Sequence, residues 1–434
     1  RKIHLRILVL SQYWWPENGV PQRRWSWLTS HLKDLGHEVV VVAPPPHYNR
    51  KLSFRDYVNS IFDRQSVYEV GPDGEKIWRC GYLPSSKSLT YRALNQGYVA
   101  ISTVITSFRQ RQSDDFRPDL VIGTVPALPT AMAAYLVGRI FNRPYIIDLR
   151  DAWPDLLDYS SAWNAGTGRK SLRERVLRRG PLQIVSKLTH ISLQFCYEHS
   201  TAMILTSDHL KQRLSERMEG NGLGPKPDLA TIRNVFPPRS TPEIKEAKPT
   251  GDKLRVLYAG TLGRAQQLSN AIEAVRIAKA RGCAVELHLV GAGATSAALR
   301  KMINGTGLPV QIYRRLGAEE MADHYEWADT ALVHLADWEP LKAAVPSKTF
   351  ELIQLGIHIS GAIQGETADI IRKLRAGDVV PPNDPEALAD LWCQLSRDRT
   401  RLAVGDGPAK ALHYEESTVV PDTLKMILNK ATGR

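Results

Sequence analysis

The sequence predicts two doubly wound α/β domains, each a parallel β-sheet covered by helices on both faces. The chain has 434 residues, more than one hydrophobic core usually holds. In both halves, short apolar runs rich in β-branched residues alternate with amphipathic stretches, which is typical of strands buried on both faces. Between the halves, residues 236–253 are rich in Pro, Thr and charge and have no hydrophobic period.

The strands are expected in chain order from these apolar runs. In the first half they are 5–10, 38–43, 119–123, 145–149 and 202–207, with amphipathic stretches such as 23–36 between them. In the second half they are 255–260, 285–291, 310–316, 330–335 and 378–382. This pattern predicts a first domain at 1–236, a linker at 237–252 and a second domain at 253–410. A C-terminal helix at 411–434 is expected to complete the first domain.

The composition, 43% apolar and 24% charged, is that of a soluble globular protein. No apolar run reaches the length of about 18 residues expected of a membrane-spanning helix. The first residues are expected to form a buried strand rather than a signal peptide. The cysteines are widely spaced without a CxxC pattern, so neither disulfides nor structural zinc are expected, and a cytosolic protein is predicted. They are Cys80, Cys196, Cys283 and Cys393.

The net charge of +12 is concentrated in the first half. Residues 1–240 hold 33 of the 57 Lys and Arg and 21 of the 45 Asp and Glu, so the remaining residues hold 24 of each. Only the first half should therefore attract an anionic partner. The excess peaks in 168–180, where basic and aliphatic residues alternate as in a helix lying on anionic lipid, and 91–111 is a second such segment. A solvated basic face and a core helix are the alternative.

Loops that follow parallel strands are the expected ligand sites. In the first half, the loop 11–25 has Gly19 as its only glycine, which argues against a GxGxxG dinucleotide fingerprint. Gly19 before a helix N-terminus suits an anion, or is an ordinary turn. Arg150 and Asp151 directly follow the strand at 145–149, where they either serve function or form an ion pair that closes a domain interface.

The second half offers a stronger set of loops. Gly260, Gly263 and Arg264 follow a strand and open a helix, an arrangement that can hold a phosphate. Gly291, after the next strand, would let the backbone approach a flat base closely. In VPSKTFELIQLG (345–356), Lys348 and Glu351 open a short helix, either as part of a ligand site or as an exposed i,i+3 ion pair.

Together these motifs resemble glycosyltransferase family 4, whose GT-B fold has two Rossmann-like domains facing each other across a cleft. The likeness extends over nearly the whole chain. The RDxWP and PSKxFE patterns resemble a subgroup of O-antigen and surface-polysaccharide transferases that act on N-acetylated or deoxy sugars. The motifs that carry this likeness are YWWPENGVPQRR, RDAWPD, YAGTLGRAQQL, LVGAG and PSKTFELIQLG.

The resemblance implies a retaining transfer of sugar from a nucleotide-diphosphate donor, by family habit UDP, without a metal or other cofactor. The acceptor would be a lipid-linked glycan at the cytoplasmic face of the membrane. Glu351 matches the family glutamate that binds the ribose hydroxyls, and Arg264 and Lys348 are expected near the diphosphate. The remaining donor-binding positions are Gly19, Gly260, Gly263 and Gly291.

On the acceptor side, Arg150 or Asp151 is expected to orient the acceptor or the transferred sugar. Trp14, Trp15 and Arg23 are the expected acceptor contacts, although tryptophans at this spacing are also typical of a core.

The sequence departs from the family at three places. In the glycine turn, the positions of the family's basic residues are Thr261 and Gln266, which leaves Arg264 as the only cation there. The family has a second glutamate eight residues before Glu351, where this chain has Ala343, so Asp337, Glu339 or the backbone would replace its contact. The frequent His-Asp pair appears as Arg150-Asp151.

Three alternatives remain open from the sequence. A nucleotide-sugar epimerase or a phosphorylase-like enzyme would keep the fold and change the chemistry. A catalytically silent membrane-bound partner of a transferase would explain Ala343. A nucleic-acid-binding protein would fit the positive charge, but no RRM, KH or zinc signature is present, and no nucleic-acid partner is expected.

Overall fold

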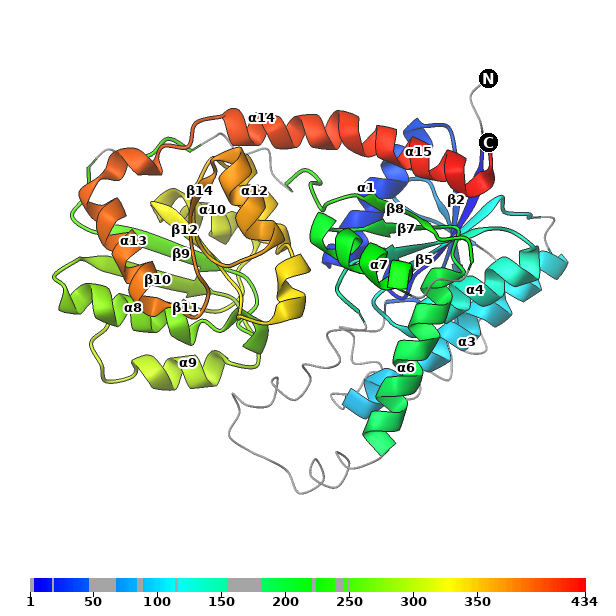
Figure 1. Cartoon of the computed structure of the whole chain (residues 1–434), viewed down its shortest axis with the longest axis horizontal. Helices are drawn as coiled ribbons and strands as arrows, with labels where there is room; N and C mark the ends of the chain where they lie inside the picture. The colour runs from blue at the N-terminus through cyan, green and yellow to red at the C-terminus, as the bar shows by residue number, and fades with distance from the viewer. Residues whose placement is uncertain are drawn as a thin grey trace. The chain divides into compact units, whose positions relative to one another are not determined.

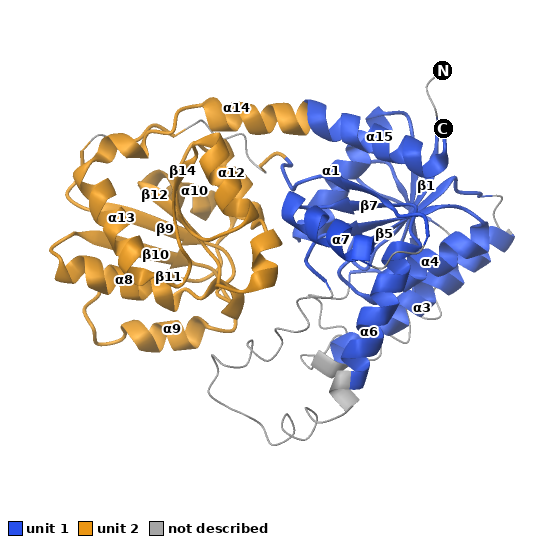
Figure 2. Cartoon of the chain, viewed as in Figure 1, with its two compact units in different colours: residues 1–154, 180–236, 418–434 blue, residues 155–179, 237–417 orange. Residues whose placement is uncertain are grey.

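The computed structural model describes residues 4–17, 19–46, 68–83, 89–113, 116–153, 181–220, 224–238, 245–248 and 250–434. The basic segment at 168–180 lies outside these residues. Two compact units divide the chain (Figure 2). Unit 1 is formed by residues 1–154, 180–236 and 418–434, and the described residues of unit 2 come from 237–417. The chain thus passes into unit 2 after Phe236 and returns to unit 1 near its C-terminus.

Unit 1 contains an eight-stranded sheet in the order β3-β4-β2-β1-β5-β6-β7-β8. All its neighbouring strands are parallel except β3 and β4. The five strands expected in this half are β1, β2, β5, β6 and β7. The strands are β1 (Arg6–Leu10), β2 (Glu38–Ala43), β3 (Glu69–Val70), β4 (Lys76–Arg79), β5 (Leu120–Val125), β6 (Tyr145–Leu149), β7 (Ala202–Leu205) and β8 (Asp228–Thr231).

Helices cover both faces of this sheet (Figure 1). The C-terminal helix α15 packs against α1, β7 and β8, while α4 packs against α3 and α6. The connection from β1 to β2 and the connection from β4 to β5 run across the sheet in opposite directions. Because both crossovers are right-handed, their helices α1 and α3 cover opposite faces of the sheet. The helices are α1 (Val20–Asp34), α3 (Leu89–Ser113), α4 (Pro129–Phe141), α6 (Pro181–Glu198), α7 (Asp208–Gly220) and α15 (Val420–Thr432).

Unit 2 contains a six-stranded, fully parallel sheet in the order β11-β10-β9-β12-β13-β14. All five expected strands of this half are present, and the unpredicted strand is β13. The strands are β9 (Leu254–Ala259), β10 (Val285–Val290), β11 (Val310–Tyr313), β12 (Thr330–His334), β13 (His358–Ala362) and β14 (Gly377–Val380). Both units therefore have the doubly wound architecture that the sequence predicts.

The helices of unit 2 enclose a core in which Val256, Leu287, Ile272 and Trp392 are fully buried. Short 3-10 helices η3 (Arg264–Gln266), η4 (Glu339–Ala343) and η5 (Arg399–Leu402) lie in its loops, and a π-helical turn η6 (Glu415–Val419) precedes α15. The α-helices are α8 (Ser269–Ala280), α9 (Ser296–Ile303), α10 (Ala318–Trp327), α11 (Ser347–Gln354), α12 (Glu366–Leu374), α13 (Pro385–Arg397) and α14 (Gly407–Tyr414).

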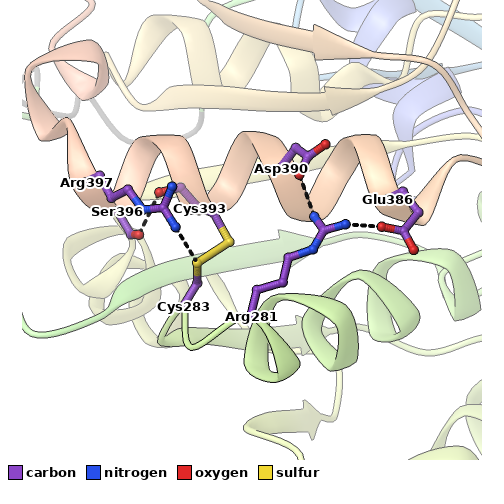
Figure 3. Close-up of a disulfide and its surroundings, with 7 residues drawn as sticks. All are labelled: Arg281, Cys283, Glu386, Asp390, Cys393, Ser396 and Arg397. Carbon is purple, nitrogen blue, oxygen red and sulfur yellow. Dashed lines mark hydrogen bonds and ion pairs between the residues drawn. A yellow bond between two sulfur atoms is a disulfide. The ribbon is translucent and has the colours of Figure 1, made fainter.

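One expectation about cysteines is wrong. Cys283, between α8 and β10, forms a disulfide with Cys393 of α13, and their Cα atoms are 5.6 Å apart (Figure 3). The two residues are 110 positions apart in sequence, and they meet because α13 packs against α8. Arg281 links the same elements through ion pairs with Glu386 and Asp390. Sequence spacing gives no signal for a bridge that depends on helix packing.

A buried ion pair organises unit 1. Arg24 of α1 and Asp148 of β6 have fully buried side chains, and Arg24 Nη2 lies 2.8 Å from Asp148 Oδ1. Because an unpaired buried charge is very costly, the remaining polar atoms of both groups also need partners. Asp148 accepts from Trp25 and Thr124, and Arg24 Nη1 donates to Asn234 and to the Ile232 carbonyl. The pair thereby joins α1, β5, β6 and the segment after β8.

We expect Asp148→Asn to lower the free energy of unfolding by about 3–5 kcal/mol, because it leaves the Arg24 guanidinium buried without its counter-charge. The matched control is Asp228→Asn, which breaks an exposed pair with Lys430 and should cost less than about 1 kcal/mol. Denaturant unfolding of both variants measures the difference. Equal losses would contradict the organising role of the buried pair.

Candidate functional site

The topology of unit 2 defines where a ligand should bind. From β9 the chain continues to β10 and β11 on one side of the sheet, and later to β12 and β13 on the other. Loops that leave neighbouring parallel strands in opposite directions open a crevice at the carboxyl ends of those strands. The switch point lies between β9 and β12, so the loops after these two strands are the first candidates for binding.

The glycine turns after β9 and β10 pack backbone against backbone. The Gly260 and Leu262 amides donate to the carbonyls of Val290 and Ala292, both at 3.0 Å. A Cβ atom on Gly291, which has a φ of +158°, would lie 1.8 Å from the Gly260 carbonyl oxygen. Gly291 is therefore required for the fit of the two turns, whatever ligand they approach.

The turn that carries Arg264 is held in place by the loop after β12. The Ala336 amide donates to the Ala265 carbonyl at 2.7 Å, and Gln266 accepts from the Gly263 amide at 3.1 Å. Within the described part of the chain, Arg264 Nε is buried and has no hydrogen-bond partner. A guanidinium with an unused donor is well suited to an anion, which is the role that the sequence predicts for Arg264.

His334, at the end of β12, contacts this turn, and nothing in the sequence indicates this contact. Its Nδ1 lies 2.6 Å from the Gln266 carbonyl oxygen and therefore donates, so Nε2 accepts from the Asn270 amide at 2.9 Å. Burial lowers the pKa of His334 to about 4, because the charged ring would be desolvated, although the Gln266 hydrogen bond partly opposes this. The neutral imidazole thus anchors the Arg264 turn to helix α8.

Lys348 and Glu351 of α11 form the i,i+3 ion pair that the sequence allowed, with 2.8 Å between Nζ and Oε2. Tyr325 of α10 completes a triad, because its hydroxyl accepts from Lys348 at 2.8 Å and donates to Glu351 Oε1 at 2.9 Å. All three groups are half-buried. A carboxylate has about four acceptor sites, so Glu351 retains the capacity to accept further hydrogen bonds from a ligand.

The position of the missing family glutamate lies in η4. Ala343 is buried, and the surrounding loop is fixed by Gly365, where a Cβ atom would lie 2.2 Å from the Lys342 carbonyl oxygen. The two acidic residues proposed as replacements are on the same loop. Asp337 accepts from Gln364, and Glu339 pairs with Lys342 at 2.7 Å. Both carboxylates therefore follow β12 at the switch point.

In unit 1 the corresponding switch point lies between β1 and β5. Arg150 spans the end of β5, donating from Nη2 to the Pro126 carbonyl at 2.9 Å and from Nε to the Val125 carbonyl at 3.3 Å. The neighbouring Asp151 has an exposed side chain next to the Arg150 charge. An exposed carboxyl at the end of a strand can accept a hydrogen bond from a sugar hydroxyl.

The remaining candidates of unit 1 lie around α1. Gly19 caps its N-terminus, as expected, and its carbonyl accepts from the Arg23 amide at 3.0 Å. The Arg23 guanidinium lies over the Phe236 ring, 4.6 Å from its centre. Trp15 is 38% exposed.

Trp14 requires a correction. Its side chain is buried, and its indole nitrogen donates to Glu75 at 2.9 Å, so it is a core residue rather than an acceptor contact.

Comparisons with known proteins show to which family the chain is similar. A model described as a glycosyl transferase 4-like domain matches residues 19–222, and a model of glycosyl transferases group 1 matches residues 253–398. A protein of Escherichia coli strain K12 described as a colanic acid biosynthesis glycosyl transferase, WcaI, is 25% identical over 323 residues, which are 72% of this chain and 74% of that protein.

Solved structures show the same fold. Sucrose-phosphate synthase from Thermosynechococcus elongatus matches with a TM-score of 0.60 and 14% identity, over 97% of both chains. Anabaena HepE in complex with UDP-glucose matches with a TM-score of 0.59 and 14% identity, over 99% of this chain and 100% of that one.

Two parallel α/β units, with candidate ligand loops at their switch points, are the architecture of a GT-B glycosyltransferase. The chain belongs to glycosyltransferase family 4, as the resemblance of its motifs predicted. In the described part of the chain no helix is both long enough and apolar enough to span a bilayer. No group of three or more potential metal-ligating side chains was found among the same residues.

The buried His334 should make the stability of the protein depend on pH. Its folded pKa of about 4 lies below the ordinary value of 6.5, so the unfolded chain binds more protons between these values. This contribution, about 3 kcal/mol at most, is complete above pH 6.5 and is lost as the pH falls toward 4. Unfolding measured across this range should have a smaller pH slope in His334→Gln, whereas the exposed control His413→Gln should keep the slope. An unchanged slope in His334→Gln would contradict the assignment.

Tyr325→Phe removes one hydroxyl that joins Lys348 to Glu351. We expect the free energy of unfolding to fall by about 1 kcal/mol, the net value of a hydrogen bond between partly buried groups. Tyr313→Phe is the control, because the Tyr313 hydroxyl donates to the exposed Gln311 side chain of its own strand. Thermal unfolding compares the two variants, and a loss as large in Tyr313→Phe would show that the triad adds nothing.

Proposed function

We propose that this protein is a retaining glycosyltransferase that moves a sugar from a nucleotide-diphosphate donor, UDP-linked, to a lipid-linked or cell-surface glycan acceptor. The transferred sugar is an N-acetylated or deoxy hexosamine, as the RDxWP and PSKxFE motifs indicate. The colanic acid relative supports a role in polysaccharide biosynthesis, and the UDP-glucose complex of HepE supports the choice of base. No metal or other cofactor takes part in the proposed reaction.

The observation that carries the proposal is the buried, unpaired Nε of Arg264 at the switch point of unit 2. Hydrogen bonds to Ala336 and His334 hold the backbone of its turn, so the point from which the guanidinium extends is set before a ligand arrives. Preorganised cations are the main way to stabilise the negative charge that develops on a leaving diphosphate. Lys348 supplies a second charge from α11, and Glu351 accepts the ribose hydroxyls.

The chemistry needs charge stabilisation more than a protein nucleophile. In the proposed step the acceptor hydroxyl attacks the anomeric carbon on the face from which the diphosphate departs. The bond from that carbon to the phosphate oxygen breaks, and the leaving phosphate takes the hydroxyl proton. Arg150 and Asp151 of unit 1 orient the acceptor or the sugar. Trp15 and Arg23 are the remaining acceptor contacts in this proposal.

The proposal also includes peripheral attachment to the inner face of the cytoplasmic membrane, where a lipid-linked acceptor is presented. The excess of basic residues in 1–240 supports this location. The segments concerned are 168–180 and 91–111, of which the second corresponds to α3.

The donor site is tested by a thermal-shift series with UDP, GDP, ADP and NAD. At a ligand concentration about 100 times Kd, binding to the native state adds about 2.7 kcal/mol to its stability, so the melting temperature should rise with UDP. Glu351→Ala should weaken UDP binding at least about tenfold, or roughly 1.4 kcal/mol, because the ribose loses charge-assisted hydrogen bonds.

The control is Glu273→Ala, which removes an i,i+3 ion pair with Arg276 on α8 and should leave UDP binding unchanged. No shift with any nucleotide would overturn the donor-site proposal. Turnover of a UDP-sugar without an acceptor would instead favour an epimerase, and binding without any transfer would favour a silent partner.

A further inference from the structure

Helix α3 has an apolar stripe on its outer face. Five large side chains on it are between 38% and 62% exposed. They recur at intervals of four and three residues, so they lie along one side of the helix. The opposite side is the one that packs, because Val99, Thr103 and Ser107 are buried. The exposed residues are Leu94, Tyr98, Ile101, Ile105 and Phe108.

Helix α6 repeats this arrangement. Five large apolar side chains are between 37% and 62% exposed, and four of them share one side of the helix at spacings of four, three and four. Leu193, Cys196 and Tyr197 are buried on the opposite side. The exposed residues are Ile184, Val185, Leu188, Ile191 and Phe195.

Helix α4 joins the two stripes into one layer. It packs against α3 and α6 (Figure 1), and its Tyr135 ring meets the Phe195 ring of α6 edge to face at 5.1 Å. Arg111 of α3 donates to the Ile140 carbonyl of α4. Leu136 of α4 is also exposed. We call these eleven exposed apolar residues of α3, α4 and α6 the docking layer.

The three helices carry many more basic than acidic residues. Glu198, at the end of α6, is the only acidic residue in the three helices, against five Lys or Arg. Lys187 lies next to the α6 stripe in the sequence and is exposed. Exposed apolar residues are ordinary when scattered, but a contiguous apolar surface indicates an interaction site. The basic residues are Arg92, Arg109, Arg111, Arg139 and Lys187.

We propose that the docking layer binds the surface of an anionic phospholipid bilayer. Apolar side chains on helices that carry Lys and Arg and almost no Asp or Glu are the pattern of helices that lie in the headgroup region. The apolar residues enter the acyl boundary, while the basic residues remain among the phosphates. The inference rests on the proposed function, which already includes membrane attachment through α3, and it adds α4, α6 and the individual residues that contact the bilayer.

The experiment measures co-sedimentation of the full-length protein with vesicles. Equimolar phosphatidylglycerol and phosphatidylethanolamine vesicles should bind it at least about tenfold more strongly than phosphatidylcholine vesicles, because the basic residues need anionic headgroups. Replacing Ile101, Ile105, Leu188 and Ile191 together by Ser should lower the partition coefficient at least about tenfold. Lys187→Glu should weaken binding and reduce its dependence on salt.

The matched control replaces exposed apolar residues on other helices, Met302→Ser, Tyr414→Ser and Met426→Ser, and should bind vesicles as the wild type does. Circular dichroism confirms that each variant is folded. The four-serine variant should also keep the wild-type thermal shift with UDP, which separates loss of docking from failure of the donor site.

Two results would overturn the inference: wild-type protein that does not bind anionic vesicles, or a four-serine variant that binds as well as the wild type. A wild-type oligomer that the four serines dissociate, without vesicle binding, would assign the layer to a protein interface instead.

Discussion

The parallel pairing of β9 with its two neighbours determines the geometry of unit 2. β9 pairs with β10 over six residues, as far as Ala259 opposite Val290. Its pairing with β12 extends over only two, Val256 with Thr330 and Leu257 with Ala331. Beyond that point the two strands no longer hydrogen-bond to each other, and the Arg264 turn and His334 meet there. The candidate anion site lies here because the chain leaves β9 and β12 toward opposite edges of the sheet.

Backbone fit and side-chain charge have separate roles at this point. The glycines at 260 and 291 let two turns pack against each other without side chains, so they determine position rather than affinity. The candidate charges are Arg264 in the glycine turn and Lys348 with Glu351 on α11. His334 holds the backbone of the Arg264 turn, and Tyr325 bonds to both Lys348 and Glu351. Neither supporting residue lies in the motif that it supports, as is common around preorganised sites.

Unit 1 uses a different constraint, a fully buried charge. Arg24 and Asp148 are tolerated in the core because the nitrogens of the guanidinium and the oxygens of the carboxylate all have hydrogen-bond partners. The same pair fixes the start of α1, where Gly19 caps the helix, relative to β6, where Arg150 and Asp151 follow. The docking layer lies on helices of this unit, so the proposed acceptor contacts and the proposed membrane surface belong to one rigid sheet and its covering helices.

The sequence by itself determined the parallel strands, the strand-end loops and the family, because apolar periodicity and glycine turns are local properties. It also singled out Arg264, Lys348 and Glu351 as candidates, because they lie within short motifs, and their roles remain predictions. Tertiary structure decided which neighbour is buried. Arg24 forms the buried ion pair with Asp148 while Arg23 lies over the Phe236 ring, and Trp14 is in the core while Trp15 is exposed. It brought together Cys283 and Cys393, and Tyr325 with Glu351, because these contacts arise from helix packing. The stripes of α3 and α6 required it as well, since a helix that is apolar on two sides does not reveal from its sequence which side packs against the sheet.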